Sequence, residues 1–519
     1  MTARRSLAAL AGGALLLGLV CVRVPARAQT PGSRVTALTV SGTQPVGTFD
    51  GVAYTRTWGT VSGVVARSEP VVGLAGLAAD AGGMVPYTSA FEIIAPSAPP
   101  GDSTVLVEIE NRGSPLVIDR LDELEINGSP ASATYPAGLG NGFLERRHIA
   151  YARVAWQNGI AAGVPASAQG IGEVIVRDFA RFLRGERAGL LPGSFDPGRY
   201  PIVMLGAISQ SAWFVNTFIA EGFNTDPVTG GAVFGGAIAV DGTGHWLAIN
   251  QLGAAAGTPQ TPYLAPGAPV LAAREIVKRP DSDPFLIDVA NYTDFYRLSA
   301  SLTDTEDLPP AMRRYDWPSP HAFVRSAAQA ATAFTTARDS GRCNGGKPIP
   351  LDPVSYDPYL RTLVVELAHR LHAPGFAREH DLPPTTLFEL QPHRQIDDAS
   401  FSAAPTRRAE LPRIPWLDAD GEPQGGVRFP ESEVPLGAPI PASIPPVVTA
   451  MLTDTCGNFS GWHALTAAEL AARYASASAY LSPFAAALDK LTTLGYLLPE
   501  EREPMLRAAS ERFAAAKAP

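Results

Sequence analysis

The chain has 519 residues, of which 46% are hydrophobic and 18% are charged, and its formal net charge at pH 7 is −9. This balance is sufficient for a large folded core and excludes an intrinsically disordered chain. The acidic net charge is unfavourable for binding to nucleic acid or to the anionic surface of a membrane.

The first 28 residues are typical of an export signal. Arg4-Arg5 is followed by the uncharged apolar stretch Leu7–Cys21, and Ala26-Arg27-Ala28 fits the small-x-small cleavage pattern. The apolar stretch is short for a membrane span, and the paired arginines also fit a twin-arginine signal. Cleavage removes four arginines and no acid, which leaves a net charge of −13. We therefore expect a periplasmic or secreted chain without stable membrane insertion.

Two cysteines, Cys343 and Cys456, remain after this cleavage. In an oxidising compartment two cysteines can form one disulfide. Two free buried thiols fit the sequence equally well.

The N-terminal part of the exported chain has a strand-like pattern. Apolar and polar residues alternate in Arg34–Val40 and Val105–Ile109, and glycines and prolines punctuate the residues between them. This period of two indicates strands. The sequence therefore predicts a β-rich portion over residues 29–135.

The pattern changes in the middle of the chain. Short apolar runs predict strands at 149–155, 202–205, 233–240 and 285–290, and helical spacing appears at 173–183 and after residue 209. Alternation of strands with helices favours a parallel sheet, so residues 136–397 are predicted to form an α/β core.

The last part, residues 398–519, is predicted to be a proline-rich segment followed by helices that pack on the core. Thr466 and Glu469 have the spacing of a capping box before an apolar run. Gly495 is placed where a helix would end, and Pro499 where another could begin.

Ser209 is the candidate nucleophile. It stands between an apolar strand and a helix, and the residues two before and two after it, Ala207 and Ser211, are small. A serine on a strand-to-helix turn needs small neighbours there, because the strand and the helix nearly collide. The backbone N–H of Gln210 would then be one oxyanion donor. The alternative is an ordinary serine that caps the helix.

A nucleophilic serine needs a histidine base and an acid that orients it. In α/β hydrolases the chain order is serine, acid, histidine. Asp294 follows the strand predicted at 285–290, and His321 lies in a later proline-rich loop. Asp241 and His245, which follow the strand predicted at 233–240, are the alternative acid and base.

The sequence favours neither a metal nor a cofactor. The glycines of Gly138–Gly142 lack the spacing of a dinucleotide-binding loop, and no Walker loop occurs. His369 and His372 share a helix face, but no H-E-x-x-H motif is present and a third ligand is not apparent.

The residues that carry these signals resemble a known family. The chain is similar to bacterial α/β-hydrolase domain proteins whose nucleophile turn reads G-x-S-Q-S-G-R. The matching stretches are Tyr54–Gly59, Asn111-Arg112-Gly113, Ala155-Trp156-Gln157, Arg177-Asp178-Phe179, Ile208–Ser211, Tyr292–Tyr296 and Arg314–His321.

This resemblance implies the α/β-hydrolase fold, with a mostly parallel central sheet between flanking helices. It implies Ser209 as nucleophile, His321 as base and Asp294 at the position of the family's glutamate. It also implies a second oxyanion donor on the backbone near Trp156 or Gln157. The sequence departs from the family where Ala212-Trp213 replaces Gly-Arg, and where an aspartate replaces the longer glutamate.

Taken together, these features predict a serine hydrolase that cleaves a small or polymeric carboxylic ester through an acyl-enzyme on Ser209. An amidase or a polyester depolymerase is the alternative among enzymes. A catalytically inactive binding protein on a hydrolase fold is the alternative of another class. The sequence leaves the oligomeric state open.

Overall fold

A computed structural model describes most of residues 29–519. The described residues are 32–97, 99, 103–126, 128, 130–136, 138–252, 270–298, 300–303, 307–322, 350–372, 382–392, 413–440 and 460–517. The export segment, Cys343 and Cys456 lie outside them, so the signal peptide and the disulfide stay predictions. Within the described ranges, every helix is too short or too polar to cross a lipid bilayer.

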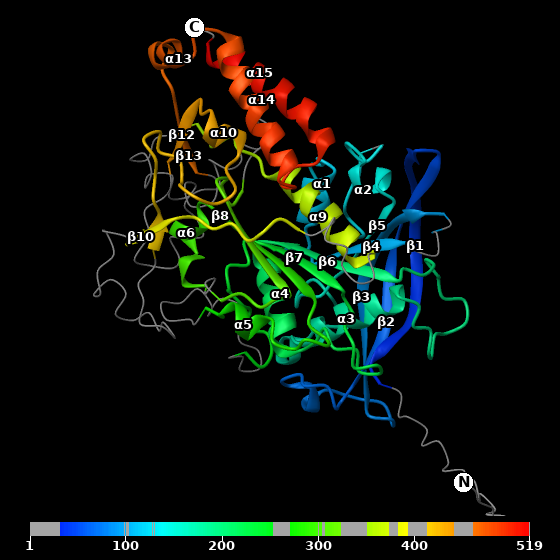
Figure 1. Cartoon of the computed structure of the whole chain (residues 1–519). Helices are drawn as coiled ribbons and strands as arrows, with labels where there is room; N and C mark the ends of the chain where they lie inside the picture. Colours follow the sequence, from blue (N-terminus) through cyan, green and yellow to red (C-terminus); the bar gives the residue numbers. More distant parts are fainter. Residues whose placement is uncertain are drawn as a thin grey trace, which may run out of the picture.

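The centre of the molecule is a nine-stranded sheet with the order β1-β2-β3-β5-β4-β6-β7-β8-β9 (Figure 1). β1, β2, β3 and β5 pair antiparallel, and each neighbouring pair from β5 to β9 is parallel. The strands are β1 (Arg34–Phe49), β2 (Val52–Ala66), β3 (Met84–Pro96), β4 (Thr104–Glu108), β5 (Ile149–Val154), β6 (Ile202–Ile208), β7 (Gly236–Val240), β8 (Phe285–Asn291) and β9 (Met312–Trp317). A β-rich N-terminal portion and a parallel core are thus confirmed.

Helices cover both faces of this sheet. The described α-helices of the core are α1 (Leu116–Leu121), α2 (Phe143–Arg146), α3 (Ile171–Leu183), α4 (Gln210–Glu221), α5 (Ala273–Ile276), α6 (Asp294–Arg297) and α9 (Asp357–His372). Short 3-10 turns occur at Leu74–Gly76, Ala166–Ala168 and Ala300–Leu302.

Alternate residues of the central strands belong to two hydrophobic cores. In β4, Val105 and Val107 pack in the core that contains α3 and α4, whereas Leu106 packs in the core that contains α1 and α9. Successive side chains of a strand point to opposite faces of a sheet, so a strand covered on both faces is apolar throughout. This explains why the middle of the chain shows continuous apolar runs.

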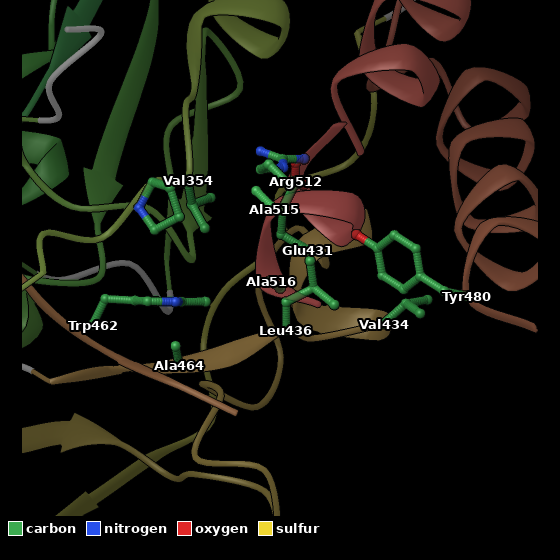
Figure 2. A pocket seen from close by; sticks show the side chains of 11 residues that line it. Val354, Glu431, Val434, Leu436, Trp462, Ala464, Tyr480, Arg512, Ala515 and Ala516 are labelled. Carbon is green, nitrogen blue, oxygen red and sulfur yellow. The ribbon is translucent and has the colours of Figure 1, made fainter. Parts of the chain in front are cut away.

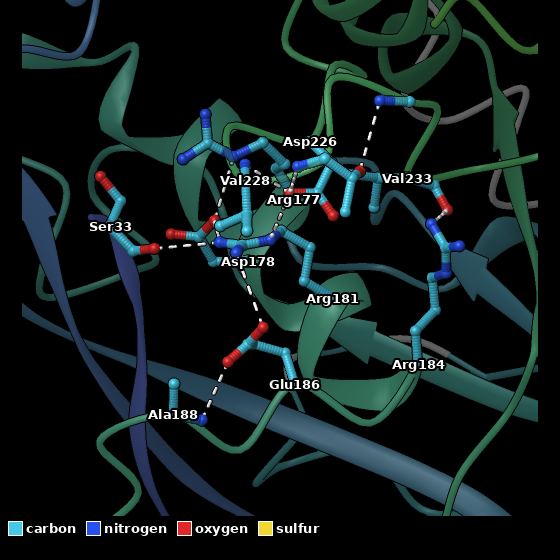
Figure 3. Close-up of polar contacts among 12 residues, drawn as sticks. Ser33, Arg177, Asp178, Arg181, Arg184, Glu186, Ala188, Asp226, Val228 and Val233 are labelled. Carbon is cyan, nitrogen blue, oxygen red and sulfur yellow. Dashed lines mark hydrogen bonds and ion pairs between the residues drawn. The ribbon is translucent and has the colours of Figure 1, made fainter. Parts of the chain in front are cut away.

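Buried ion pairs join α3 to the N-terminal hairpin of β1 and β2. The guanidinium of Arg177 lies 2.6 Å from the Glu69 carboxylate, which follows β2. Arg181 donates to the carbonyl of Ser33 at 3.0 Å and to Asp178 at 3.2 Å (Figure 3). Burial alone would raise the pKa of Glu69, but its bonds to Arg177 hold that pKa below its ordinary value. The Arg-Asp pair recognised in the sequence therefore positions a helix.

The C-terminal part packs against the α9 side of the sheet. Its described elements are β10 (Leu390–Pro392), β11 (Arg413–Pro415), α10 (Pro430–Glu433), β12 (Gly437–Ile440), β13 (Gly461–Ala464), α13 (Ala467–Arg473), α14 (Ala477–Thr493), the 3-10 turn Pro499–Glu501 and α15 (Arg502–Ala516). Figure 1 shows α14 and α15 side by side, and their apolar residues belong to the same core as those of α1 and α9.

The ends of these C-terminal helices follow the sequence signals. Thr466 caps α13, and its hydroxyl and backbone N–H both bond Glu469 as the capping box predicts. Gly495, just past α14, has the left-handed φ of +78° that glycine adopts without strain. A small apolar pocket lies between α10, the antiparallel pair of β12 and β13, and α15, lined among others by Val434 and Trp462 (Figure 2).

Candidate active site

Ser209 occupies a strained turn between β6 and α4. Its backbone has φ +65° and ψ −130°, a conformation that a residue with a side chain rarely adopts. Ala207 is buried, and the Ser211 hydroxyl donates to the carbonyl of Ile208 at 2.7 Å. Both neighbours are small enough for the close approach of strand and helix. The turn therefore holds the Ser209 side chain at the carboxyl end of the sheet.

His321 lies within hydrogen-bond distance of the Ser209 hydroxyl. Its Nε2 is 3.0 Å from Ser209 Oγ, and its Nδ1 is 2.9 Å from Oδ1 of Asp294. The backbone N–H of His321 donates to the hydroxyl of Thr293 at 2.7 Å. A carboxylate at Nδ1 keeps the proton on that nitrogen and leaves Nε2 able to accept one.

These three side chains come from separate elements that meet at one edge. Ser209 follows β6, Asp294 begins α6 after β8, and His321 lies in the loop after β9. The carboxyl ends of parallel strands meet at one edge of a sheet, so residues far apart in sequence can converge there. Asp294 is fully buried and His321 nearly so.

Asp241, the alternative acid in the sequence, also reaches His321. It follows β7, and its Oδ2 lies 3.2 Å from His321 Nδ1. His245, the alternative base, has its Nε2 2.6 Å from the carbonyl of Leu298. The sequence presented Asp241 and Asp294 as competing choices for the acid, and the structure brings both of them to His321.

The ligand-type atoms of Asp241, Asp294 and His321 lie within 4.8 Å of one another, a spacing that could also suit a metal ion. Nδ1 of His321 makes a hydrogen bond of 2.9 Å to Asp294, whereas Oδ2 of Asp241 approaches the same nitrogen at 3.2 Å as an ion-pair contact without a hydrogen bond. The arrangement is therefore explained by the orientation of His321.

A loop that the sequence analysis did not assign to the site lies beside Ser209. β4 is the neighbour of β6 in the sheet, and the side-chain amide of Asn111, just past β4, donates to the carbonyl of Ile208 at 3.2 Å. Arg112, next in the chain, has a positive φ of 50°. The Asn111-Arg112-Gly113 motif was the available sequence signal, but it did not indicate that this loop lies next to the turn at Ser209.

Trp156 and Gln157, the residues expected near the second oxyanion donor, follow β5, one strand further away. Trp156 is buried, and its indole donates to the carbonyl of Glu110 in the loop after β4 at 2.9 Å. Trp213, which replaces an arginine of the resembling family, is also buried, and its indole donates to the carbonyl of Asp241 at 3.0 Å. Both tryptophans therefore support the loops around Ser209.

Two buried carboxyls lie where β4 ends: Glu108 is its last residue and Glu110 follows in the loop. Burial raises the pKa of Glu108 to about 7, although two backbone N–H groups of α1 bond its carboxylate. Burial raises the pKa of Glu110 to about 7 as well, against the opposing effect of Arg153.

The raised pKa values of Glu108 and Glu110 predict that the protein loses stability as pH rises. A group whose pKa is higher in the folded than in the unfolded state stabilises the fold fully below the unfolded pKa, and this contribution declines as pH rises towards the folded pKa. We expect the free energy of unfolding in urea to fall by up to about 3 kcal/mol per carboxyl between about pH 4.5 and 7. The free energy of unfolding of Glu110→Gln should fall less steeply with pH. That of Glu503→Gln, a substitution on the surface, should follow wild type. A free energy that is constant over this range contradicts the prediction.

Comparison with known proteins places the chain in a family. A family model described as "Alpha/beta hydrolase domain" matches residues 132–507. A search of curated proteins returned no match.

Similar solved structures share little sequence with the chain. The apo prolyl oligopeptidase B from Galerina marginata is 13% identical, with a TM-score of 0.27, over 50% of this chain and 33% of that protein. The methylesterase BT1017 is 12% identical, with a TM-score of 0.26, over 56% of this chain and 53% of the methylesterase. The rice cell wall degrading esterase LipA from Xanthomonas oryzae is 12% identical, with a TM-score of 0.22, over 40% of this chain and 50% of that esterase. The chain thus spans about a third to a half of the length of these proteins.

The family model covers well over half of the chain, and the described residues form a mostly parallel sheet with flanking helices. The chain therefore belongs to the alpha/beta hydrolase domain family and has the fold of a hydrolase.

Proposed function

We propose that the protein is a serine hydrolase that cleaves a carboxylic ester through an acyl-enzyme on Ser209. The observation that carries the proposal is the continuous series of contacts from Ser209 Oγ to His321 at 3.0 Å and from His321 to Asp294 at 2.9 Å. A serine at a strained turn, followed along the chain by a buried acid and then by a histidine, provides the parts that acyl transfer requires.

In this mechanism Ser209 Oγ attacks the ester carbonyl while His321 Nε2 takes the hydroxyl proton. The resulting oxyanion is stabilised by the backbone N–H of Gln210 and by a second N–H from the loops after β4 and β5. His321 then protonates the leaving alcohol, and the acyl group stays on Ser209. Water, deprotonated by His321, attacks the acyl-enzyme and releases the acid and the serine hydroxyl.

An ester is proposed because its alcohol leaves more readily than the amine of an amide. A polyester depolymerase uses the same residues, so the proposed substrate is a small or a polymeric ester. An amidase also uses these residues and is the alternative among enzymes. The S-Q-S elbow, which the sequence shares with a bacterial group of these hydrolases, is consistent with the proposal. We further propose, from the predicted export signal, that the reaction takes place in the periplasm or outside the cell.

Labelling with a fluorophosphonate tests the proposed function. The purified mature protein should be labelled at Ser209 and should hydrolyse p-nitrophenyl esters, because the activated hydroxyl attacks both reagents. Ser209→Ala should do neither. Ser194→Ala, which removes an exposed hydroxyl bonded to the Leu191 carbonyl, is the matched control and should react like wild type. Equally weak labelling of wild type and Ser209→Ala would favour the inactive binding protein instead.

A further inference from the structure

Two carboxylates lie at the same nitrogen of His321. Oδ1 of Asp294 is 2.9 Å from Nδ1, and Oδ2 of Asp241 is 3.2 Å from it. Both aspartates are fully buried. An imidazole has one hydrogen on Nδ1, so His321 cannot donate a full hydrogen bond to both acids at once.

Asn291, the last residue of β8, bonds both acids. Its side-chain amide donates to Asp241 Oδ1 at 2.7 Å, and its backbone N–H donates to Asp294 Oδ2 at 3.0 Å. Its own side-chain oxygen accepts from the Ser319 hydroxyl at 2.6 Å, which fixes the orientation of the amide. Each acid therefore has one oxygen at Asn291 and the other near His321.

The backbone of Asp241 is held in place separately from its side chain. It has a positive φ of 63°, which costs a residue other than glycine conformational energy. Its N–H donates to the carbonyl of Val289 at 2.8 Å, and its carbonyl accepts from the Trp213 indole. Such strain persists where surrounding contacts determine the conformation, so Asp241 is placed at His321 by the fold.

The nearby basic group does not neutralise this pair of acids. Arg314, on β9, contacts Asp288 and lies 2.9 Å from Asp316. His245, from the loop after β7, has its Nε2 at a backbone carbonyl. Asp288 and Asp316, on β8 and β9, share this one arginine. Burial raises the pKa of Asp288 against the opposing effect of Arg314, and the nearby charge of Asp294 raises it further.

We propose that Asp241 is a second positioning residue for His321, and that Asp241 and Asp294 share one proton in the resting protein. Two adjacent carboxylates in a buried site cannot both ionise without strong repulsion, and sharing a proton relieves it. The pair then carries one negative charge beside the imidazolium that forms when Ser209 loses its proton to Nε2. This inference rests on the proposed function of the site.

Single and double substitutions test the pairing. The values of kcat/KM for a p-nitrophenyl ester are measured against pH for wild type, Asp241→Asn, Asp294→Asn and the double variant. Each single variant should stay within about 100-fold of wild type, because the remaining carboxylate still orients His321, and the double variant should lose about 10⁴-fold. Asp196→Asn, an exposed aspartate paired with Arg187, is the control and should be unchanged.

The pH profile of Asp294→Asn separates the pairing from a merely structural role of Asp241, because with a single orienting acid this variant alone would lower the apparent pKa of His321. In each single variant the pair still carries one negative charge, so the apparent pKa on the acid side of the kcat/KM profile should stay close to that of wild type. In the double variant this pKa should fall by about 1–3 units, because the imidazolium loses its counter-charge. A fall of that size in either single variant overturns the shared proton.

A measurement without turnover separates this inference from the proposed function. The Nδ1 proton should give a downfield proton NMR resonance, assigned by its absence in His321→Ala. The resonance should persist in both single variants and disappear in the double variant. If wild type neither hydrolyses esters nor reacts with a fluorophosphonate, the proposed function is wrong, and the resonance still decides the pairing. Full loss of rate or resonance in one single variant, with the other unchanged, shows that a single acid orients His321.

Discussion

Replacing His321 with alanine is expected to lower kcat for ester hydrolysis by about 10⁴- to 10⁶-fold. The imidazole is the group within 3.0 Å of Ser209 Oγ, and without it the serine proton has no acceptor at that position. KM should change much less, because the loops and the oxyanion donors that hold the substrate stay in place. The measurement is steady-state hydrolysis of a p-nitrophenyl ester by the mature protein.

The double variant Ser209→Ala/His321→Ala sharpens this prediction. Residues that act as one unit are not additive, so the double variant should be about as slow as either single variant. His369→Ala, which removes an exposed histidine of α9, should retain wild-type rates. Losses from Ser209→Ala and His321→Ala that multiply in the double variant would mean that the two residues act independently.

Arg153→Met is expected to reduce the free energy of unfolding by about 3–5 kcal/mol. The Arg153 side chain is fully buried in β5 and lies 2.6 Å from Glu92 and 3.4 Å from Glu110. It also donates to the carbonyl of Gly113, in the loop beside Ser209, at 3.1 Å. Methionine fills a similar volume but removes the counter-ion of Glu110 and one of the two arginines that contact Glu92, which keeps Arg56. That loss is the reason for the large effect.

Equilibrium unfolding in urea measures this loss. Arg502→Met removes an exposed arginine paired with Asp489 and should leave the unfolding midpoint almost unchanged. Glu110→Gln in the Arg153→Met background should recover part of the stability, because it removes one of the orphaned charges. A midpoint of Arg153→Met equal to that of wild type would show that the buried charges do not depend on this arginine.

The strands of the core were predictable where their residues are apolar. Runs predicted at 202–205 and 285–290 correspond to β6 and β8, and the predicted helix at 173–183 is α3 with two further residues at its start. β9 was not predicted as a strand, because Arg313, Arg314 and Asp316 interrupt its apolar pattern. In the structure Arg314 is buried between Asp288 and Asp316, so ion pairing replaces hydrophobicity there.

The candidate site was predictable residue by residue but not as an arrangement. Ser209, Asp294 and His321 each carried a local signal, namely a turn, the end of a strand and a loop. That Asp241 lies at the same nitrogen as Asp294 depends on the adjacency of β7 and β8 and on the single side chain of Asn291. A one-dimensional pattern presents two such acids as alternatives, because it contains no distance between them.

The backbone of Ser209 has a consequence for how this chain evolves. Glycine adopts a φ of +65° without a clash, whereas serine there costs the folded state about 1–3 kcal/mol. A lineage that no longer used the hydroxyl would gain robustness to other mutations by drifting to glycine. Under the proposed function, the strained serine marks a position where selection favours chemistry over stability.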